Sequence, residues 1–368
     1  MKPKVKVVIG ANYGDEGKGL VSAELAKKAA DHGHKVLTVL YNGGAQRGHT
    51  ANGIVHHCTA AGAEWGSDTY YGPRFMLDPI ALWLSEQRAF VDPMCRVVLP
   101  HDVIAGRGWE MSRGLDRHGS CGMGIFAACK RNANPSTRLL AYDAFHEPIL
   151  FLEKRLAKYS ELKGEPLDEV YNVRNFFEAI RWMRRTCLCM PLKEIKTAYD
   201  TVIFEGGQGL LLDQGNAGGF PHLTPSNTGA RNTLGLIKEL NDGKDGYADL
   251  YYVSRTYMTR HGAGRLMDEC KREDINPDIV DETNLPNQWQ GSLRFGYLHP
   301  DEMVKRIKND AKRFDGVGNK TINLVFTQAN YTEGKLAIGE GKRIDIPKFD
   351  GVDKIWVSDN REEMRAWL

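Results

Sequence analysis

Apolar and polar positions along the chain change between short buried-strand patterns and longer helical ones. Val5 to Ile9 is a short apolar run that predicts a buried strand. A glycine-rich turn follows, then a helical pattern from Leu20 to Ala30, and then His34 to Leu40, which predicts a second strand. This order is typical of a parallel α/β sheet whose loops lie at the carboxyl ends of the strands.

Further strand patterns are spread over the rest of the chain, each followed by a turn or by polar residues. They are Arg96 to Leu99, Thr201 to Phe204, Tyr251 to Ser254, Asn323 to Phe326 and Lys354 to Val357. Charged helical patterns lie between them, notably Glu147 to Lys163 and Val173 to Arg185, and Gly262 to Asn287 predicts a long polar connection. We therefore expect one α/β domain, residues 1–368, with a mostly parallel central sheet, surrounding helices and inserted subdomains.

The composition is that of an ordinary soluble protein, and it argues against a nucleic-acid or membrane partner, a disulfide framework and a zinc site. Hydrophobic residues make up 42% and charged residues 26%, and the net charge of +2 gives no electrostatic reason to expect nucleic acid or a membrane as partner. The seven cysteines show no repeated CxxC spacing, which favours reduced thiols over a disulfide framework or a zinc site. Because no apolar run is long enough for a signal or a membrane span, we expect a cytoplasmic protein.

The strongest chemical signal is the loop directly after the first strand, Gly10 to Gly19, with the sequence GANYGDEGKG. Its glycines allow backbone N–H groups to approach phosphate oxygens, and the helix that starts beyond Lys18 adds a favourable dipole. The spacing is not that of a Walker A loop, because Gly19 stands where Ser or Thr would hold magnesium. The loop predicts a triphosphate site; the alternative is a tight turn that carries surface charges.

A second glycine-rich loop, Tyr41 to Thr50, follows the second predicted strand. We expect the two strands to be neighbours, so that the two loops lie side by side. His49 would then offer a positive hydrogen-bond donor to a phosphoryl group in transfer. The alternative is that His49 is a satisfied core or surface histidine.

Blocks of sequence in a fixed order over nearly the whole chain resemble the adenylosuccinate synthetase family. The blocks are Gly14 to Gly19, Gly43-Gly44, Gly48-His49-Thr50, Gly119 to Ile125, Phe204 to Gly209, Leu211-Leu212-Asp213, Thr224 to Thr228 and Thr259 to Gly264. Their shared order is far more specific than any single block.

The resemblance implies a P-loop-related ligase that works in two steps. The γ-phosphoryl group of a nucleoside triphosphate is transferred to the 6-oxygen of a purine nucleotide, and the amine of aspartate then displaces phosphate. It implies that Asp15 removes the N1 proton, that His49 stabilises the transferring phosphoryl group, and that Gln208 orients the purine. It also implies a homodimer, and Mg²⁺ held by Asp15, the Gly48 carbonyl and the phosphates.

The same resemblance assigns ligand contacts in three groups. The triphosphate would contact Gly14, Glu16, Gly17, Lys18, Gly19, Gly48, His49, Thr50, Gln328, Asn330 and Ser358. The purine monophosphate would contact Asn12, Asp15, Gln46, Ser120, Cys121, Arg131, Gln208, Thr224 and His261, where Arg131 or Arg138 is the candidate to reach across the dimer. Aspartate would contact Gln290, Gly291, Ser292 and Arg294.

The chain departs from the family at the position that reads the base of the triphosphate. Ordinary members use GTP and bind guanine through the carboxylate of a Thr-Lys-x-Asp motif, where this chain has Thr327-Gln328-Ala329-Asn330. The Asn330 amide offers one acceptor and one donor, which suit adenine but cannot satisfy both guanine donors. We therefore expect ATP; the alternative is that Asn330 is a turn residue.

Two further departures concern the other substrates. Arg294 remains to clamp a carboxylate of aspartate, but Ser292 stands where relatives carry an arginine near the ribose 2′-hydroxyl. Cys121 and Met123 replace a common Thr and Arg. With ATP and a short chain, these features resemble the phage branch of the family, called PurZ.

That branch joins L-aspartate to dGMP and gives N6-succino-2-amino-2′-deoxyadenylate, a step towards diaminopurine DNA. We therefore expect dGMP, L-aspartate and ATP as substrates, and the host cytoplasm as location if a phage encodes the chain. One alternative is an ordinary adenylosuccinate synthetase that uses IMP and GTP. Another is a nucleotide-binding regulator without catalysis, against which the joint presence of Asp15, Lys18, His49 and Gln208 argues.

Overall fold

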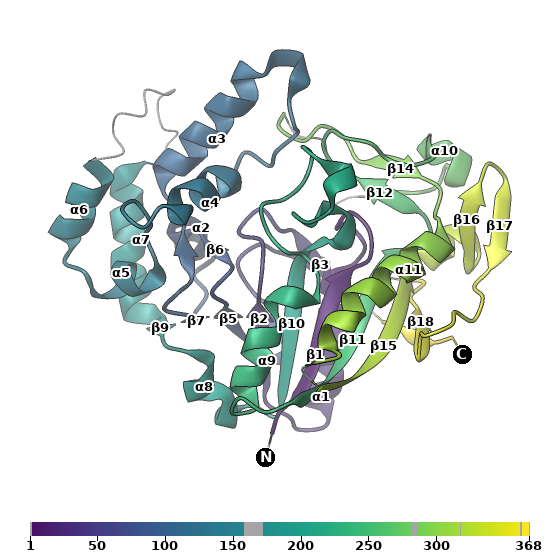
Figure 1. Ribbon diagram of the computed structural model, residues 1–368, viewed down its shortest axis with the longest axis horizontal. Helices are drawn as coiled ribbons and strands as arrows, with labels where there is room; N and C mark the ends of the chain where they lie inside the picture. Colours follow the sequence, from purple (N-terminus) through teal and green to yellow (C-terminus); the bar gives the residue numbers. More distant parts are fainter. Residues whose placement is uncertain are drawn as a thin grey trace.

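The computed structural model describes residues 2–157, 172–281, 284, 286, 288–316, 318–360 and 363–367. A ten-stranded sheet forms its centre (Figure 1). In spatial order the strands are β19 (Arg365–Ala366), β18 (Lys354–Val357), β15 (Gly318–Thr327), β11 (Gly246–Arg255), β1 (Lys4–Gly10), β10 (Thr201–Gly209), β2 (Val36–Leu40), β5 (Asp68–Tyr71), β7 (Phe90–Val91) and β9 (Leu188–Cys189). Every neighbouring pair is parallel except β18 and β19.

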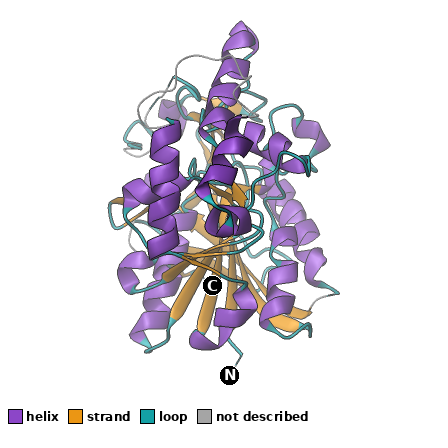
Figure 2. Cartoon of the chain, turned by 90° about the vertical axis from the view of Figure 1, so that its left-hand side faces the viewer, coloured by secondary structure: helices purple, strands orange, loops and turns teal. Residues whose placement is uncertain are grey.

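The central strands are short apolar runs because both faces of the sheet are covered. Along β1, Val5, Val7 and Ile9 pack into one cluster of buried side chains and Val8 into another on the opposite face. Helices lie on both sides of the strands in Figure 2. The α1 side chain Leu25 packs with Val8, whereas helices α9 and α11 cover the other face.

The helices are α1 (Lys18–Asp31), α2 (Pro79–Ser85), α3 (Pro100–Ser112), α4 (Ile125–Ala133), α5 (Ala141–His146), α6 (Ile149–Ala157), α7 (Val173–Thr186), α8 (Leu192–Ile195), α9 (Leu234–Leu240), α10 (Arg272–Ile275) and α11 (Pro300–Ala311). Short 3-10 helices are η1 (Ala63–Trp65), η2 (Gly114–Asp116), η3 (Lys196–Ala198), η4 (Leu210–Leu212), η5 (Ala217–Gly219), η6 (Ala230–Asn232), η7 (Lys312–Phe314) and η8 (Ala329–Thr332). None of the described helices has the length and apolar character that crossing a bilayer requires.

Four small sheets surround the central one. They are the hairpin β3 (His49–Ala51) with β4 (Ile54–His56), the pair β6 (Met76–Leu77) with β8 (Arg96–Val97), the sheet of β12 (Met258–Arg260), β14 (Arg294–Gly296) and β13 (Glu269–Cys270), and the hairpin β16 (Lys335–Gly339) with β17 (Lys342–Asp345). The β3–β4 hairpin begins at His49, so the second glycine-rich loop leads directly into it.

The predicted α/β class with a mostly parallel central sheet is confirmed, and six of the seven predicted strands lie in that sheet. The prediction that Arg96 to Leu99 forms a strand of the central sheet was wrong. Only Arg96–Val97 is extended, and it pairs with β6 in a separate small sheet. The helix predicted from Glu147 begins at Ile149 and is described to Ala157; residues 158–163 lie outside the described residues. Within Gly262 to Asn287 the structure contains β13 and α10, and residues 282, 283, 285 and 287 lie outside the description. The single-domain boundaries stay a prediction.

The expectation that the first two strands are neighbours was wrong. Strand β10 lies between them: Phe204 faces Val7 of β1 on one side and Val39 of β2 on the other. A helical crossover joins β1 to β2, and such a connection can skip a strand position that a later part of the chain fills. As a result, Glu205 and the glycine-rich end of β10 lie between the two loops.

Candidate active site

The loop Gly10 to Gly19 connects β1 to α1 at the carboxyl edge of the sheet. At two of its positions the structure explains why the residue is glycine. Gly17 has φ of 88° at the start of α1, a left-handed conformation that glycine adopts without strain. A Cβ on Gly19 would lie 2.8 Å from the Cβ of His49, so only glycine lets the two loops approach this closely. The second glycine therefore positions His49.

Glu16 holds the loop together from within. Its Oε1 accepts hydrogen bonds from the backbone N–H groups of Asn12 (2.9 Å) and Gly14 (2.8 Å). Burial raises the pKa of Glu16, and its Oε2 lies 3.5 Å from Nζ of Lys18. The Glu16 side chain was predicted to contact the triphosphate, but the structure places it behind the loop.

The two glycine-rich loops enclose a cavity of about 80 Å³, called the phosphate cavity below. Its lining is Gly14, Asp15, Gly17, Lys18, Gly19, Leu20, Gly48, His49, Thr50, Arg255, Asp281, Asn284, Thr327, Gln328 and Asn360. The structure thus brings together nine of the residues predicted to bind the triphosphate or metal. A carboxylate on Asp15 and a carbonyl on Gly48 are the hard oxygen ligands that Mg²⁺ accepts beside phosphates and water.

Besides Glu16, two predicted triphosphate contacts lie outside this lining. Asn330 is exposed on η8, next to Gln328, which lines the cavity with φ of 59°. Ser358 is buried, and its hydroxyl donates to the carbonyl of Asn360 at 2.7 Å. Asn360, which we did not predict, lines the cavity instead; it lies in a short polar stretch with no recognisable motif.

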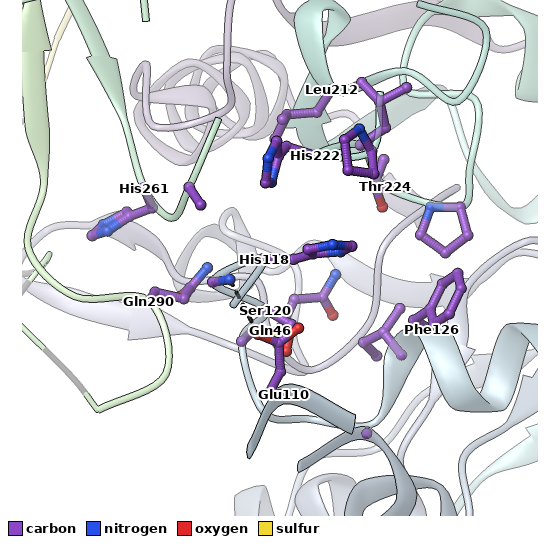
Figure 3. Close-up of a pocket in the computed structure, with 18 of the residues that line it drawn as sticks. Gln46, Glu110, His118, Ser120, Phe126, Leu212, His222, Thr224, His261 and Gln290 are labelled. Atoms are coloured by element: carbon purple, nitrogen blue, oxygen red, sulfur yellow. Dashed lines mark hydrogen bonds between the residues drawn. The ribbon is translucent and has the colours of Figure 1, made fainter. Parts of the chain in front are cut away.

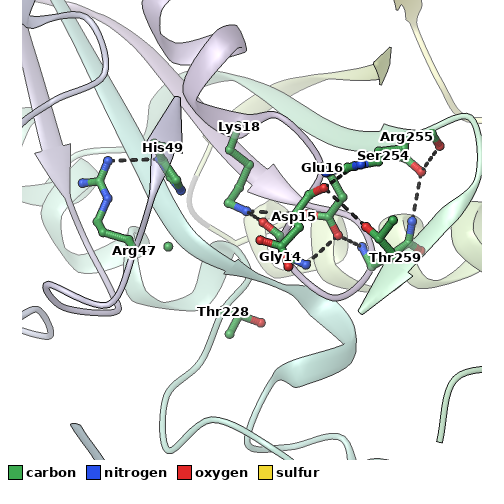
Figure 4. Close-up of polar contacts among 12 residues, drawn as sticks. Gly14, Asp15, Glu16, Lys18, Arg47, His49, Thr228, Ser254, Arg255 and Thr259 are labelled. Atoms are coloured by element: carbon green, nitrogen blue, oxygen red, sulfur yellow. Dashed lines mark hydrogen bonds and ion pairs between the residues drawn. The ribbon is translucent and has the colours of Figure 1, made fainter. Parts of the chain in front are cut away.

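His49 is held by a buried network that the sequence did not predict (Figure 4). Its Nδ1 lies 2.5 Å from Oε1 of Glu205 and 3.0 Å from Nη2 of Arg47, and Arg47 forms an ion pair with the same carboxylate. The other oxygen of Glu205 accepts from the N–H of Ala61 at 3.2 Å. His49 Nε2 is buried without a hydrogen-bond partner, and His49 lines the phosphate cavity.

Burial and charge fix the protonation of this network. Burial, followed by the positive charge of Arg47, lowers the pKa of His49 to about 3, although Glu205 opposes the shift. Burial alone would raise the pKa of Glu205, but Arg47 and the hydrogen bond from His49 lower it to about 2. At neutral pH the imidazole is therefore uncharged and donates from Nδ1 to a carboxylate. The expectation that His49 offers a positive donor to a phosphoryl group in transfer stays a prediction, and it requires that the neutral ring gain a proton there.

Figure 3 shows a second cavity of about 350 Å³, called the nucleotide pocket below. Ligand pockets for small molecules span roughly 300–1,000 Å³, so this one is large enough for a nucleotide. Its lining includes the predicted contacts Gln46, Ser120, Cys121, Gln208, Thr224, His261 and Gln290. Burial raises the pKa of Cys121 to about 11, which keeps its thiol neutral.

The pocket also contains polar groups that we did not predict. Glu110 accepts from the N–H of Gly119 at 3.2 Å and pairs with Arg113 at 2.7 Å. The rings of His118 and His222 meet edge to face with centroids 5.1 Å apart. These residues lie in stretches without a recognisable motif, so only the fold assembles them.

The walls of the two cavities are in contact at Gln208. A Cβ on Gly14 of the phosphate cavity would lie 3.3 Å from the Cα of Gln208, which lines the nucleotide pocket. Gln46 and Gly48 line the two cavities from one loop, two residues apart. The two cavities are therefore neighbours, with Gly14 and Gln208 in the wall between them.

Three predicted nucleotide contacts are not in the pocket, of which Asp15 lines the phosphate cavity and the other two line neither cavity. Asn12 is buried in the core, where its amide binds Ser254 (2.9 Å) and accepts from Arg306 (2.7 Å). Arg131 makes a two-pronged ion pair with Asp102 and also donates to backbone carbonyls. Its side chain therefore anchors α4 within its own subunit. Because that contact would be made across a dimer, the prediction that Arg131 contacts a nucleotide stays a prediction.

The predicted aspartate loop is only partly at the pocket. Gln290 lines it, whereas Gly291 and Ser292 are exposed outside the lining. Arg294 donates to the carbonyls of Gly262 and Gly264 at 3.0 and 2.8 Å, and its guanidinium also forms an ion pair with Glu269. Arg294 is therefore engaged with protein partners in this conformation.

Known proteins resemble this chain over most of its length. The family model described as adenylosuccinate synthetase matches residues 7–287. Adenylosuccinate synthetase of Clostridium botulinum is 25% identical, with 98% of this chain and 87% of the relative covered; that of a Marinomonas species is 28% identical over 73% and 65%.

Two solved structures share the fold. The fully ligated adenylosuccinate synthetase of Plasmodium falciparum aligns with a TM-score of 0.69 and 14% identity, over 99% of this chain and 87% of the other. Succinoaminodeoxyadenylate synthetase (PurZ) of cyanophage S-2L, bound to dGMP and to dATP as energy donor, aligns with a TM-score of 0.62 and 17% identity, over 100% and 96%. With the family model matching most of the sequence, the chain belongs to the adenylosuccinate synthetase family, carbon–nitrogen ligases that act on a purine nucleotide and aspartate.

Proposed function

We propose that the protein joins L-aspartate to the 6-position of dGMP at the expense of ATP. The observation that carries this proposal is the contact between the walls of the two cavities at Gln208, with His49 Nε2 buried and unpartnered in the phosphate cavity. A triphosphate tail in one cavity would lie against the keto edge of a purine in the other. The products would be N6-succino-2-amino-2′-deoxyadenylate, ADP and phosphate.

The chemistry follows from the poor leaving ability of a purine 6-oxygen. Asp15 would take the N1 proton, and the 6-oxygen would attack the γ-phosphorus as the bond to ADP breaks. The aspartate amine would then add at C6 and expel phosphate, with loss of a proton. Phosphoryl transfer of this kind depends on positioning and charge neutralisation more than on covalent help from the protein.

Several side chains have roles that their surroundings support. Lys18 lines the phosphate cavity and would pair with the terminal phosphates. His49, whose Nδ1 is held by Glu205, would take up a proton from water at Nε2 as the dianionic phosphoryl group arrives, and Nε2–H would then donate to that group. Mg²⁺, held by Asp15 and the Gly48 carbonyl, would supply further charge neutralisation.

The residues at the end of β15, where we propose that the base of the triphosphate binds, would favour adenine over guanine. Asn330 follows Gln328 at the end of β15, in place of a carboxylate. The neighbouring carboxylate, on Asp359, is paired with Arg365 at 2.8 Å. A carboxylate free to accept both guanine donors is thus missing among these described residues, and the Asn330 amide matches adenine.

Asn330→Asp should shift the donor preference from ATP towards GTP. A carboxylate can accept both guanine donors, whereas it meets only one donor and a lone pair on adenine. We expect the ratio of kcat/KM for GTP over ATP to rise about tenfold or more. Steady-state assays with both donors would measure the ratio, and Asn319→Asp, at the far end of β15, is the matched control. An unchanged ratio would remove Asn330 from base recognition.

The choice of dGMP as substrate rests on the resemblance to the phage branch. The chain spans 96% of the cyanophage enzyme, whose structure contains dGMP. Ser292, where relatives carry an arginine, is exposed and leaves no guanidinium at that position to demand a ribose 2′-hydroxyl. The ordinary reaction, with IMP and GTP, is the second candidate, because the curated relatives named above are adenylosuccinate synthetases.

A substrate matrix separates the two candidates. Purified protein with aspartate and Mg²⁺ would be assayed for phosphate release and for the aspartyl adduct, with dGMP, GMP and IMP against ATP, dATP and GTP. We expect dGMP with an adenine donor to give the highest kcat/KM. Higher activity with IMP and GTP would replace our proposal by the ordinary reaction, and phosphate release without an adduct would contradict both.

We also propose that residues 1–368 act as one catalytic domain within a homodimer. Arg131 is held by Asp102, so the exposed Arg138 is the arginine that could reach a neighbouring subunit. Equilibrium ultracentrifugation would measure the state of association, and Arg138→Ala would test the contact through the KM for the monophosphate.

A further inference from the structure

His261 follows β12 and lines the nucleotide pocket, at its edge beside Gln290 in Figure 3. Its two ring nitrogens have different surroundings. Nε2 lies 3.2 Å from Oδ1 of Asn284, whereas Nδ1 is buried and has no hydrogen-bond partner. A buried polar atom without a partner in a ligand pocket needs a partner from the ligand. What Nδ1 can bind depends on which nitrogen carries the proton.

The orientation of the Asn284 amide is set by its other neighbour. Nδ2 of Asn284 lies 2.8 Å from Oδ2 of Asp281, and the same oxygen accepts from Nη2 of Arg255 at 2.8 Å. Arg255 is buried and always charged, so it keeps Asp281 ionised. An ionised carboxylate only accepts hydrogen bonds, and therefore the amide nitrogen, not the oxygen, must face Asp281.

This orientation determines the tautomer of His261. Because Asn284 presents its oxygen to Nε2, Nε2 must be the nitrogen that carries the proton. In the neutral ring, Nδ1 is then an acceptor. A series of four side chains, Arg255, Asp281, Asn284 and His261, thus fixes a lone pair at one place in the nucleotide pocket.

We propose that Nδ1 of His261 accepts a hydrogen bond from the 2-amino group of a guanine nucleotide and so makes the pocket specific for it. The inference rests on the proposed function and names the residue that selects dGMP. Guanine carries an N–H donor at C2, whereas hypoxanthine carries only C–H there. With hypoxanthine, Nδ1 would stay buried and unpaired, which disfavours binding.

Other unpartnered acceptors in the pocket do not discriminate in this way. Oε1 of Gln46, Oε1 of Gln208 and Nδ1 of His222 are also buried without partners, and no charged side chain among the described residues makes a hydrogen bond to the His222 ring that would fix its tautomer. No carboxylate fixes either amide, so each can turn and present its nitrogen to a ligand acceptor. Only His261 has its acceptor fixed by charged groups behind it among the pocket residues described, and this makes it the specificity residue.

The test combines a variant without the acceptor with a ligand that lacks the 2-amino group. His261→Val removes the acceptor, and dIMP is dGMP without its 2-amino group. We expect the wild type to show at least tenfold higher kcat/KM, and tighter binding by titration calorimetry, for dGMP than for dIMP. In His261→Val the two ligands should differ by less than about threefold, mainly through weaker binding of dGMP. His32→Val, at an exposed site after α1, is the control and should keep the wild-type ratio.

Asn284→Ala tests the same series without changing the pocket wall. Without the amide oxygen the His261 tautomer is free, and the ratio of dGMP over dIMP should fall by an intermediate amount. This variant also replaces His261→Val if a melting curve shows that His261→Val does not fold.

The outcomes separate the inference from the proposed function. If the wild type prefers dGMP and both variants keep that preference, the inference fails while the proposed function stands. If His261→Val changes the ratio of dGMP over GMP instead, the ring reads the sugar and the inference is wrong. If the wild type itself prefers dIMP or IMP, the proposed function fails and the inference falls with it.

Discussion

Replacing Asp15 by asparagine should lower kcat by about 10²- to 10⁴-fold, the usual contribution of a general base. Asp15 lines the phosphate cavity, and its backbone carbonyl accepts from Nε of Arg255 at 2.6 Å. This anchor does not involve the carboxylate, so asparagine should keep the loop in place. We expect nucleotide affinities within about threefold of the wild type, because the variant loses the proton acceptor but keeps the loop that lines the phosphate cavity.

Single-turnover phosphate release would measure the loss of chemistry, and titration calorimetry would measure nucleotide binding. Asp31→Asn, at the exposed end of α1, is the matched control with the same change of charge. Because Asp15 is also the proposed Mg²⁺ ligand, the assays need a series of Mg²⁺ concentrations. Recovery of the rate at high Mg²⁺ would show a metal role without a base role, and full activity at all concentrations would exclude both.

The parts of the fold that the sequence predicted are those with strong local patterns. Val5 to Ile9 and Leu20 to Ala30 have the period of a buried strand and of a helix, and they form β1 and α1. Strands β7 and β9 have two residues each, which is too short for any period to show. The place of β10 between β1 and β2 depends on pairing between distant segments, and no local pattern encodes such pairing.

The candidate active site likewise has parts that the sequence predicted and parts that it did not. The glycine-rich loops were predictable because glycine is required where loops approach each other, as Gly19 shows against His49. Arg47 was not predictable, because a charged residue in a loop is usually at the surface, and only β10 brings Glu205 close enough to bury it. The tautomer of His261 depends on Asn284 and Asp281, which are at least 20 residues away along the chain.

The pair Arg47–Glu205 should also dominate the stability of this region. Both side chains are fully buried, at 1% and 0% exposure, and Nε and Nη1 of Arg47 have no hydrogen-bond partners. Glu205→Gln would leave the buried guanidinium without its counter-charge, so the free energy of unfolding should fall by about 3–5 kcal/mol. Arg47→Leu with Glu205→Leu should recover a large part of this loss, because no buried charge then remains unpaired. Urea unfolding at pH 7.5 would measure each value.

The network also predicts a decrease of stability in acid. The carboxyl of Glu205 titrates at about 4.5 when unfolded and about 2 when folded, so its contribution is complete above pH 4.5 and lost as the pH falls through 2. His49 titrates at about 6.5 when unfolded and about 3 when folded, so the unfolded state binds the proton first and stability falls with pH below 6.5. Both groups therefore act in the same direction, and between pH 6.5 and 4.5 the loss comes from His49.

His49→Asn isolates this part of the acid response. In the wild type, His49 should contribute a decrease of at most about 1.4 kcal/mol in unfolding free energy per pH unit within that window. In His49→Asn that part of the slope should vanish, while the decrease below pH 4.5 from Glu205 remains. Urea unfolding at half-unit intervals from pH 7.5 to 4 would show the difference, with the exposed His32→Asn as control. Equal slopes in His49→Asn and His32→Asn would mean that folding does not lower the pKa of His49, and the lowered pKa assigned to the buried imidazole would be wrong.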